Sequence, residues 1–116
     1  MPEGPEIRQA ADALARVLFG PPLVRIDYRL PALRRRARAL RGAAVQRVYA
    51  RSKALLIEFD CGLTHYSHNQ LYGKWDIRPA GEPPAARRIV RVELATPDHV
   101  ATLYSATQVA LLRELD

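Results

Sequence analysis

The sequence predicts a mainly β fold with some α content, a β-sandwich with an N-terminal helix packed beside it. An apolar pattern of helical period fills the first segment, and short segments with strand patterns follow it, separated by turn residues. The length of 116 residues, 48% of them hydrophobic, suits one compact domain with a modest core. No internal repeat or domain boundary is apparent, so residues 1–116 are expected to form a single domain.

The first predicted element is an amphipathic helix over residues 5–19. Apolar side chains recur there at helical spacing, at Ile7, Ala11, Leu14 and Leu18. The helix is expected to end at residues 20–22, Gly-Pro-Pro, because this run removes both the helical dihedral angles and a backbone donor.

Two further elements follow the predicted helix. Residues 23–30 alternate between apolar and polar side chains, which predicts a half-buried strand. The apolar members of this alternation are Val24, Ile26, Tyr28 and Leu30. Residues 32–41 return to helical spacing and predict a short helix that ends at Gly42. This helix carries a cluster of arginines that we interpret as a solvated face: Arg34, Arg35, Arg36, Arg38 and Arg41.

The rest of the chain predicts strands divided by turn residues. The predicted strands are residues 43–50, 54–59, 63–67, 75–78, 89–95 and 100–105, followed by a short apolar element at 109–115. Residues 51–53 lie between the first two of these strands, which places Lys53 at or beside a hairpin tip. Residues 79–88 are rich in Pro, Gly and Ala and predict a flexible surface loop.

The charge balance favours a polyanionic partner. Lys and Arg total 18 against 12 Asp and Glu, a formal charge of +6, and nucleic acid is the obvious candidate. A basic domain that binds no DNA is the alternative. The single cysteine, Cys61, can form neither an intrachain disulfide nor a zinc site by itself, which fits a reducing cytosol. Without a long apolar run or a signal peptide, the protein is expected to be soluble and intracellular.

Pro2 carries the most chemical information. Removal of the initiator Met, which is normal before a small residue, leaves the secondary amine of Pro2 as the chain terminus. An α-amino group has a pKa of about 8, so part of it is an unprotonated nucleophile at neutral pH. Attack on a sugar carbon yields an iminium ion, which acidifies the neighbouring carbon for elimination. Glu3 can deliver a proton to the opening ring. As acids at a helix start, Glu3 and Glu6 can also be caps alone.

A second group of candidates follows the predicted strand at residues 63–67. Leu71 and Tyr72, after Gln70, can replace the stacking that is lost when a base leaves the duplex. His68 and Asn69 can donate to backbone phosphates. The structural alternative is that Leu71 and Tyr72 end a strand over the core while His68 and Asn69 stabilise a turn.

Three segments resemble the formamidopyrimidine-DNA glycosylase and endonuclease VIII family: residues 1–6 (MPEGPE), 52–56 (SKALL) and 66–73 (YSHNQLYG). The run with QLY looks closer to the endonuclease VIII branch. The resemblance extends across essentially the whole chain. It implies a base-excision repair DNA glycosylase with AP lyase activity that removes oxidised bases, pyrimidines in this branch, and cleaves the strand by elimination.

The resemblance also implies roles for individual residues. Pro2 matches the nucleophile that forms the imine, Glu3 the acid that assists ring opening, and Lys53 a lysine required for base removal. Glu6 matches a supporting glutamate near the active site.

On the DNA-binding side, Gln70, Leu71 and Tyr72 match residues that enter the duplex and fill the gap left by the extruded nucleotide. Asn69 matches a phosphate contact, and His68 stands beside it.

The family enzymes continue into a helix-two-turn-helix domain and usually a zinc finger, and this chain shows neither. We therefore expect a truncated form that is weak or inactive alone. No metal site and no cofactor are expected in it. The expected partner is double-stranded DNA with oxidised bases or abasic sites, bound by a monomer in the bacterial cytoplasm, at the nucleoid and away from membranes.

Two other functions remain open at this point. The chain can be a non-catalytic DNA-binding fragment or an inactive homologue. It can also be an N-terminal-proline tautomerase, although those proteins resemble short βαβ units in which the proline starts a strand, and here a helix is expected directly after Pro2.

Overall fold

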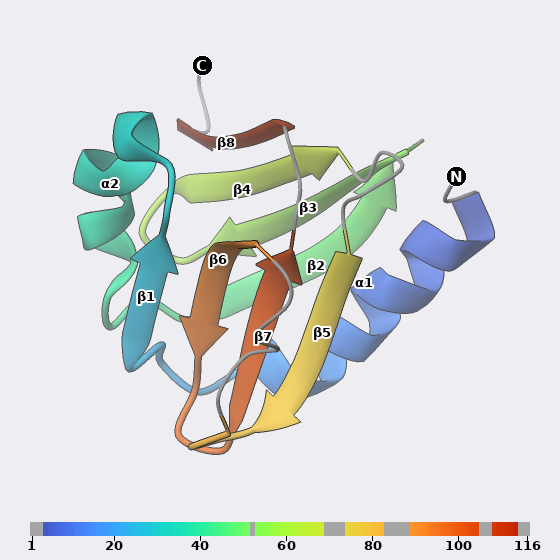
Figure 1. Ribbon diagram of the computed structural model, residues 1–116, viewed down its shortest axis with the longest axis horizontal. Coiled ribbons are helices and arrows are strands. Elements are labelled where there is room, and N and C mark those ends of the chain that lie inside the picture. Colours follow the sequence, from blue (N-terminus) through green and yellow to red (C-terminus); the bar gives the residue numbers. More distant parts are fainter. Residues whose placement is uncertain (1–3, 52, 69–73, 83–88, 105–107, 114–116) are drawn as a thin grey trace.

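The computed structural model describes residues 4–51, 53–68, 74–82, 89–104 and 108–113. Within them the chain forms two antiparallel four-stranded sheets, with the helix α1 beside them (Figure 1). The predicted β-sandwich with a packed N-terminal helix is therefore confirmed. This arrangement also differs from the βαβ unit expected of a tautomerase.

Each sheet combines strands from distant parts of the chain. The first sheet has the order β1 (Arg25–Tyr28), β6 (Val90–Ala95), β7 (His99–Tyr104) and β5 (Lys74–Pro79). The second sheet has the order β2 (Val45–Arg51), β3 (Ala54–Phe59), β4 (Leu63–His68) and β8 (Gln108–Arg113). Residues 109–113 of the short apolar element expected at 109–115 thus belong to the edge strand β8, paired with β4, and 114–115 lie outside the described residues. Of the surface loop expected at 79–88, Pro79 ends β5, Ala80 and Gly81 form a turn, and 83–88 lie outside the described residues.

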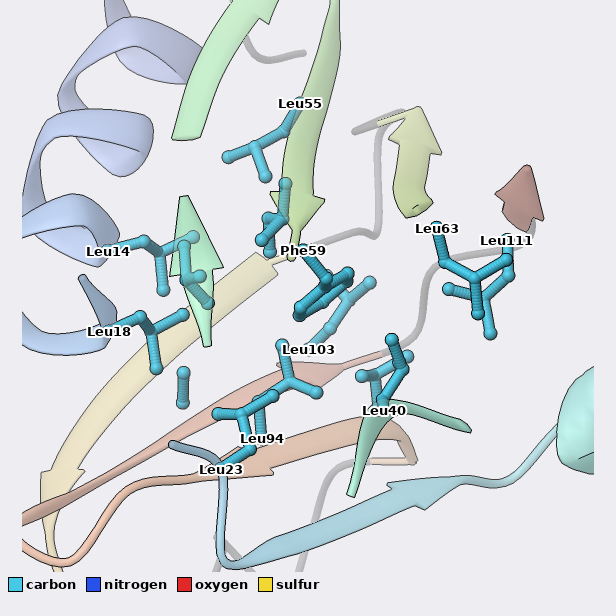
Figure 2. Close-up of a cluster of buried hydrophobic side chains, with 14 of the residues drawn as sticks. Leu14, Leu18, Leu23, Leu40, Leu55, Phe59, Leu63, Leu94, Leu103 and Leu111 are labelled. Carbon is cyan, nitrogen blue, oxygen red and sulfur yellow. The ribbon is translucent and has the colours of Figure 1, made fainter. Parts of the chain in front are cut away.

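The helix α1 (Gly4–Leu18) follows the predicted helix closely. Its periodic residues Ile7, Leu14 and Leu18 are buried, and the helix packs against β2, β3 and β7. Figure 2 shows Leu14 and Leu18 within the same apolar cluster as Leu55 and Leu103, which come from the two sheets. Burying one such leucine stabilises the fold by about 1.5–3 kcal/mol. The helix is therefore held by its apolar stripe.

The predicted basic helix is present but begins and ends one residue earlier than expected, and its last turn is a 3-10 turn. It consists of α2 (Pro31–Ala37) and the 3-10 turn η1 (Arg38–Leu40). A proline at the first helical position explains the start, because its fixed φ suits a helix and its missing donor is not needed there. Gly42 has a φ of +84°, a left-handed conformation that favours glycine and ends the element. All five clustered arginines are exposed, as predicted.

The predicted burial of one residue in the first strand is wrong. Val24 was placed on the buried face with Tyr28, but its side chain is 49% exposed. The reason is that Val24 precedes β1 and lines an open groove instead of being covered by the core.

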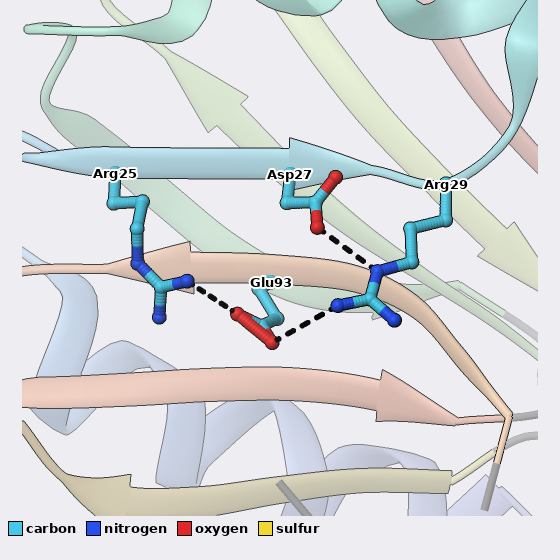
Figure 3. A network of polar contacts seen from close by, with 4 residues as sticks. All are labelled: Arg25, Asp27, Arg29 and Glu93. Carbon is cyan, nitrogen blue, oxygen red and sulfur yellow. Dashed lines mark hydrogen bonds and ion pairs between the residues drawn. The ribbon is translucent and has the colours of Figure 1, made fainter. Parts of the chain in front are cut away.

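A charge network lies on β1 and β6 (Figure 3). Glu93 is 2% exposed, and its carboxylate is 2.9 Å from Arg25 and 4.0 Å from Arg29. The contact with Arg25 is an ion pair without the geometry of a hydrogen bond. Arg29 also donates to Asp27 over 2.9 Å. A buried carboxylate needs such partners, so part of the arginine excess serves the fold.

No helix among the described residues is long and apolar enough to cross a membrane.

Candidate active site and nucleic-acid interface

The ends of all four strands of the second sheet form one row across the sheet. Arg51 at the end of β2 pairs with Ala54 at the start of β3. Ala54 pairs with His68 at the end of β4, and His68 pairs with Gln108 at the start of β8. We call this row, with Lys53 in the turn between β2 and β3, the hairpin edge. It is defined by Arg51, Lys53, His68 and Gln108.

The start of α1 lies at the same edge. Phe19, directly after the helix, forms a bridge with Val45 at the start of β2, and α1 packs along β2. The helix of 15 residues and the strand of 7 residues both span about 22–23 Å. The end of α1 is joined to the start of β2, and the two elements are equally long and packed along one another. The start of α1 therefore lies beside the end of β2. Gly4 at the start of α1 therefore lies at the end of the sandwich where β2 reaches Arg51 (Figure 1).

The first sheet also contributes to this region through the ends of its strands. Lys74 at the start of β5 pairs with Tyr104 at the end of β7. Residues 69–73 connect His68 to Lys74, and residues 105–107 connect Tyr104 to Gln108. Both connections therefore begin or end at the hairpin edge.

Two of the predicted site residues have described side chains. Lys53 lies in the β2–β3 turn, as predicted, and is half-buried with no ion-pair partner among the described residues. His68 is also half-buried, and its Nδ1 atom is buried without a hydrogen-bond partner in the described ranges. The structure thus brings a cation and an imidazole to one edge, a combination that can contact phosphate oxygens.

The remaining predicted residues are only partly covered. Glu6 belongs to the first turn of α1, where the backbone alone is described. The residues that lie outside the described part of the chain are Pro2, Glu3, Asn69, Gln70, Leu71 and Tyr72. Their predicted roles, and the predicted exposure of Leu71 and Tyr72, stay predictions.

Sequence reasoning did not single out two polar residues of this edge. Arg51 is exposed, and its guanidinium lies 5.9 Å from the ring centre of Tyr49, over which Arg47 lies at 4.1 Å. Its position directly before the hairpin turn is a signal that could have found it. Gln108 reaches the edge only through the pairing of β8 with β4, which no local pattern reveals.

A buried polar contact joins the two sheets. The hydroxyl of Tyr28 on β1 is 2.7 Å from Nδ1 of His65 on β4, whose ring meets that of Trp75 on β5 edge-on, with centres 5.5 Å apart. Burial lowers the pKa of His65 to about 3 and raises the pKa of Tyr28 well above its ordinary value. The imidazole is therefore neutral at physiological pH and can accept the phenol hydrogen bond. His65 therefore has a structural role as the buried partner of Tyr28, and it does not transfer protons at physiological pH.

The described residues include no metal-binding group. No three His, Cys, Asp or Glu side chains within the described ranges lie close enough together to hold a metal ion. Cys61 is exposed in the turn between β3 and β4, which is the opposite end of β3 from the hairpin edge.

The comparisons with known proteins agree with this architecture. Residues 1–108 match the formamidopyrimidine-DNA glycosylase N-terminal domain family. A protein named Endonuclease 8 from Shigella flexneri is 48% identical over 113 residues, and one from Enterobacter sp. (strain 638) is 47% identical over 112 residues. Each alignment covers 97% of this chain and 43% of the relative. The chain therefore spans less than half the length of these curated relatives.

Solved structures share the fold at lower sequence identity. MutM in complex with DNA containing carbocyclic 8-oxo-G superimposes with a TM-score of 0.84 at 19% identity, covering 97% of this chain and 45% of that one. Lactococcus lactis Fpg in complex with abasic-site DNA gives a TM-score of 0.84 at 18% identity, with coverage of 97% and 45%. These likenesses concern the fold, while the match over residues 1–108 decides the family. The chain belongs to the family of the formamidopyrimidine-DNA glycosylase N-terminal domain.

Proposed function

We propose that residues 1–116 are the N-terminal catalytic domain of a base-excision repair DNA glycosylase with AP lyase activity. The observation that carries this proposal is the meeting of Lys53, His68 and the start of α1 at the hairpin edge. Gly4 is two residues from Pro2, a covalent distance of at most about 7.6 Å between Cα atoms. The near identity in length of α1 and β2 thus supports a shared site for the Pro2 amine and the Lys53 ammonium.

The proposed reaction begins at the Pro2 nitrogen. Its lone pair attacks C1′ of the damaged nucleotide, the glycosidic bond breaks, and the base leaves with its electron pair and takes up the proton that the Pro2 nitrogen loses. Glu3 gives a proton to the sugar-ring oxygen, so the ring opens and an iminium ion forms. Loss of a proton from C2′ then expels the 3′ phosphate, which cuts the strand. Water releases the sugar and returns the free Pro2 amine.

The other predicted residues act on the bound DNA. Lys53 places a mobile positive charge beside the lesion or a phosphate and is needed for base removal, with Glu6 in a supporting role. Gln70, Leu71 and Tyr72 fill the gap in the duplex.

Phosphate contacts come from His68 and Asn69 in this proposal. The partner is double-stranded DNA that carries oxidised bases, of which oxidised pyrimidines are the preferred class, or abasic sites. The protein works as a monomer in the bacterial cytoplasm, at the nucleoid, and this domain needs no cofactor.

The proposal is tested with the chain that begins at Pro2, on abasic duplex DNA and on a duplex with an oxidised pyrimidine. We expect borohydride to trap a covalent adduct on abasic DNA, with slow strand cleavage, and little excision of the intact base at physiological salt. The physical reason is that duplex affinity scales with the number of phosphates neutralised and that base flipping must be driven by further contacts. A single domain supplies only part of the phosphate contacts and only part of the contacts that drive base flipping.

Two outcomes would contradict this expectation. Absence of any trapped adduct would favour the non-catalytic DNA-binding alternative. Excision at the rate of a full-length relative, measured side by side, would show that the binding energy comes from this domain alone.

Replacing Lys53 separates base removal from strand cleavage. In single-turnover assays at low ionic strength, which strengthens phosphate contacts, K53Q should lower excision of an oxidised pyrimidine on the order of a hundredfold. Cleavage at abasic sites should fall far less, because the base is already absent there. Arg51→Gln is the matched control, since it removes one positive charge from the same edge. Equal losses on both substrates would mean that Lys53 serves DNA binding alone.

A further inference from the structure

A groove of about 890 Å³ opens between β1 and the helical pair α2 and η1. Val24 and Ile26 belong to its aliphatic lining, and Arg34, Arg38 and Arg41 line its helical side. We call these five residues the arginine groove. Val24 is 49% exposed although it is a large apolar residue, so a ligand in this groove would meet both apolar surface and positive charge.

The three arginines carry charge that the fold does not balance. They are spaced by four and three residues, which brings like charges to one side of the helical pair, and such an arrangement is self-repelling. The sequence of α2, PALRRRA, contains no acid that would offset them. None of the three has an ion-pair partner among the described residues.

The two other charged residues of the groove are already engaged. Arg25 pairs with Glu93, and Asp27 accepts a hydrogen bond from Arg29 (Figure 3). Because Glu93 and Asp27 are matched by Arg25 and Arg29, the charges of Arg34, Arg38 and Arg41 remain in excess, and the groove favours an anionic ligand.

The arginine groove is separate from the hairpin edge. The helix α2 lies at the opposite side of the sandwich from the start of α1 (Figure 1). A ligand in the groove would thus leave the proposed active site open.

We propose that the arginine groove binds an acidic peptide segment of a partner protein. Carboxylates of the segment pair with Arg34, Arg38 and Arg41, and an apolar side chain rests on Val24 and Ile26. The lining argues against a single-stranded nucleic acid. Single-stranded nucleic acid binds through bases stacked on exposed aromatic rings, and the aromatic residue of this groove, Tyr28, is only 2% exposed. The exposed lining is aliphatic, which suits a leucine-like anchor.

The test measures the binding of a short fluorescein-labelled peptide in which leucines interrupt a run of glutamates, by fluorescence anisotropy. The double variant R34Q/R38Q should weaken binding by about tenfold, equivalent to about 1.4 kcal/mol. The matched control is R35Q/R16Q, which makes the same change in net charge at exposed arginines outside the groove. This control should bind the peptide as the unaltered chain does. A peptide of glutamates alone should bind more weakly, and Val24→Ser should reduce that difference.

Three results would overturn the proposal. Equal weakening in both double variants would show a general charge effect. Tighter binding of a single-stranded oligonucleotide or of a DNA duplex than of the peptide, with the same dependence on Arg34 and Arg38, would make the groove a nucleic-acid surface. Self-association that R34Q/R38Q abolishes, measured by analytical ultracentrifugation, would assign the groove to a second copy of the chain.

Discussion

A chain that retains Met1 is expected to form at least about a hundredfold less borohydride-trapped adduct with abasic DNA than the chain that begins at Pro2. Retention converts the Pro2 nitrogen into an amide, whose lone pair is delocalised and does not attack a sugar carbon. It also moves the free amine by one residue, about 3.8 Å along the chain. Misplacement of a reacting group by even 1 Å can lower a rate on the order of a hundredfold, so the Met1 amine is a poor replacement.

The control for this experiment addresses the other amines of the chain. Lys53 and Lys74 are its two lysines. In the chain that begins at Pro2, the double variant K53Q/K74Q should still form the adduct on preformed abasic sites. Unaltered trapping in the Met1 form would refute the role proposed for the Pro2 amine, and loss of that trapping in the lysine variant would assign the nucleophile to a lysine.

Much of the fold follows from local patterns, because the strands and the helix each have a strong period. The stripe of Ile7, Leu14 and Leu18 predicted α1, and the turn at residues 60–62 correctly separated β3 from β4. Strand neighbours are a different matter. Pairing of β1 with β6 and of β4 with β8 joins segments far apart in the sequence, and alternation says which face is buried but not which strand lies beside it.

The same limit applies to the site. Local turn residues sufficed to place Lys53 at a hairpin. The neighbours of His68 depend on the register between strands, which local sequence patterns do not determine. In β4 the apolar residues Leu63 and Tyr66 are three positions apart, so they point to opposite faces of the strand. The inward face is that of Leu63, His65 and Ser67. A histidine was thus buried where a simple apolar count would not place one, because Tyr28 of the other sheet supplies a hydrogen-bond partner.

Burial of His65 is expected to make the protein sensitive to acid. In the unfolded chain this imidazole titrates with an ordinary pKa of about 6.5, whereas burial lowers the pKa in the folded state to about 3. Between these values the unfolded state binds a proton that the folded state does not. His65 should therefore lower the free energy of unfolding by about 1.4 kcal/mol for each pH unit from 6.5 down to 3, with no contribution to the slope above 6.5.

Chemical denaturation as a function of pH, with two variants, isolates this contribution. His65→Leu removes the titrating group, so its pH dependence should lose this slope even if its stability at neutral pH is lower because the Tyr28 hydroxyl is left without its partner. Tyr28→Phe removes the hydroxyl but keeps the imidazole buried. Because burial is the cause of the lowered pKa, Tyr28→Phe should keep the slope. An unchanged slope in His65→Leu would mean that other groups govern the acid sensitivity, and that the imidazole does not resist protonation in the folded core.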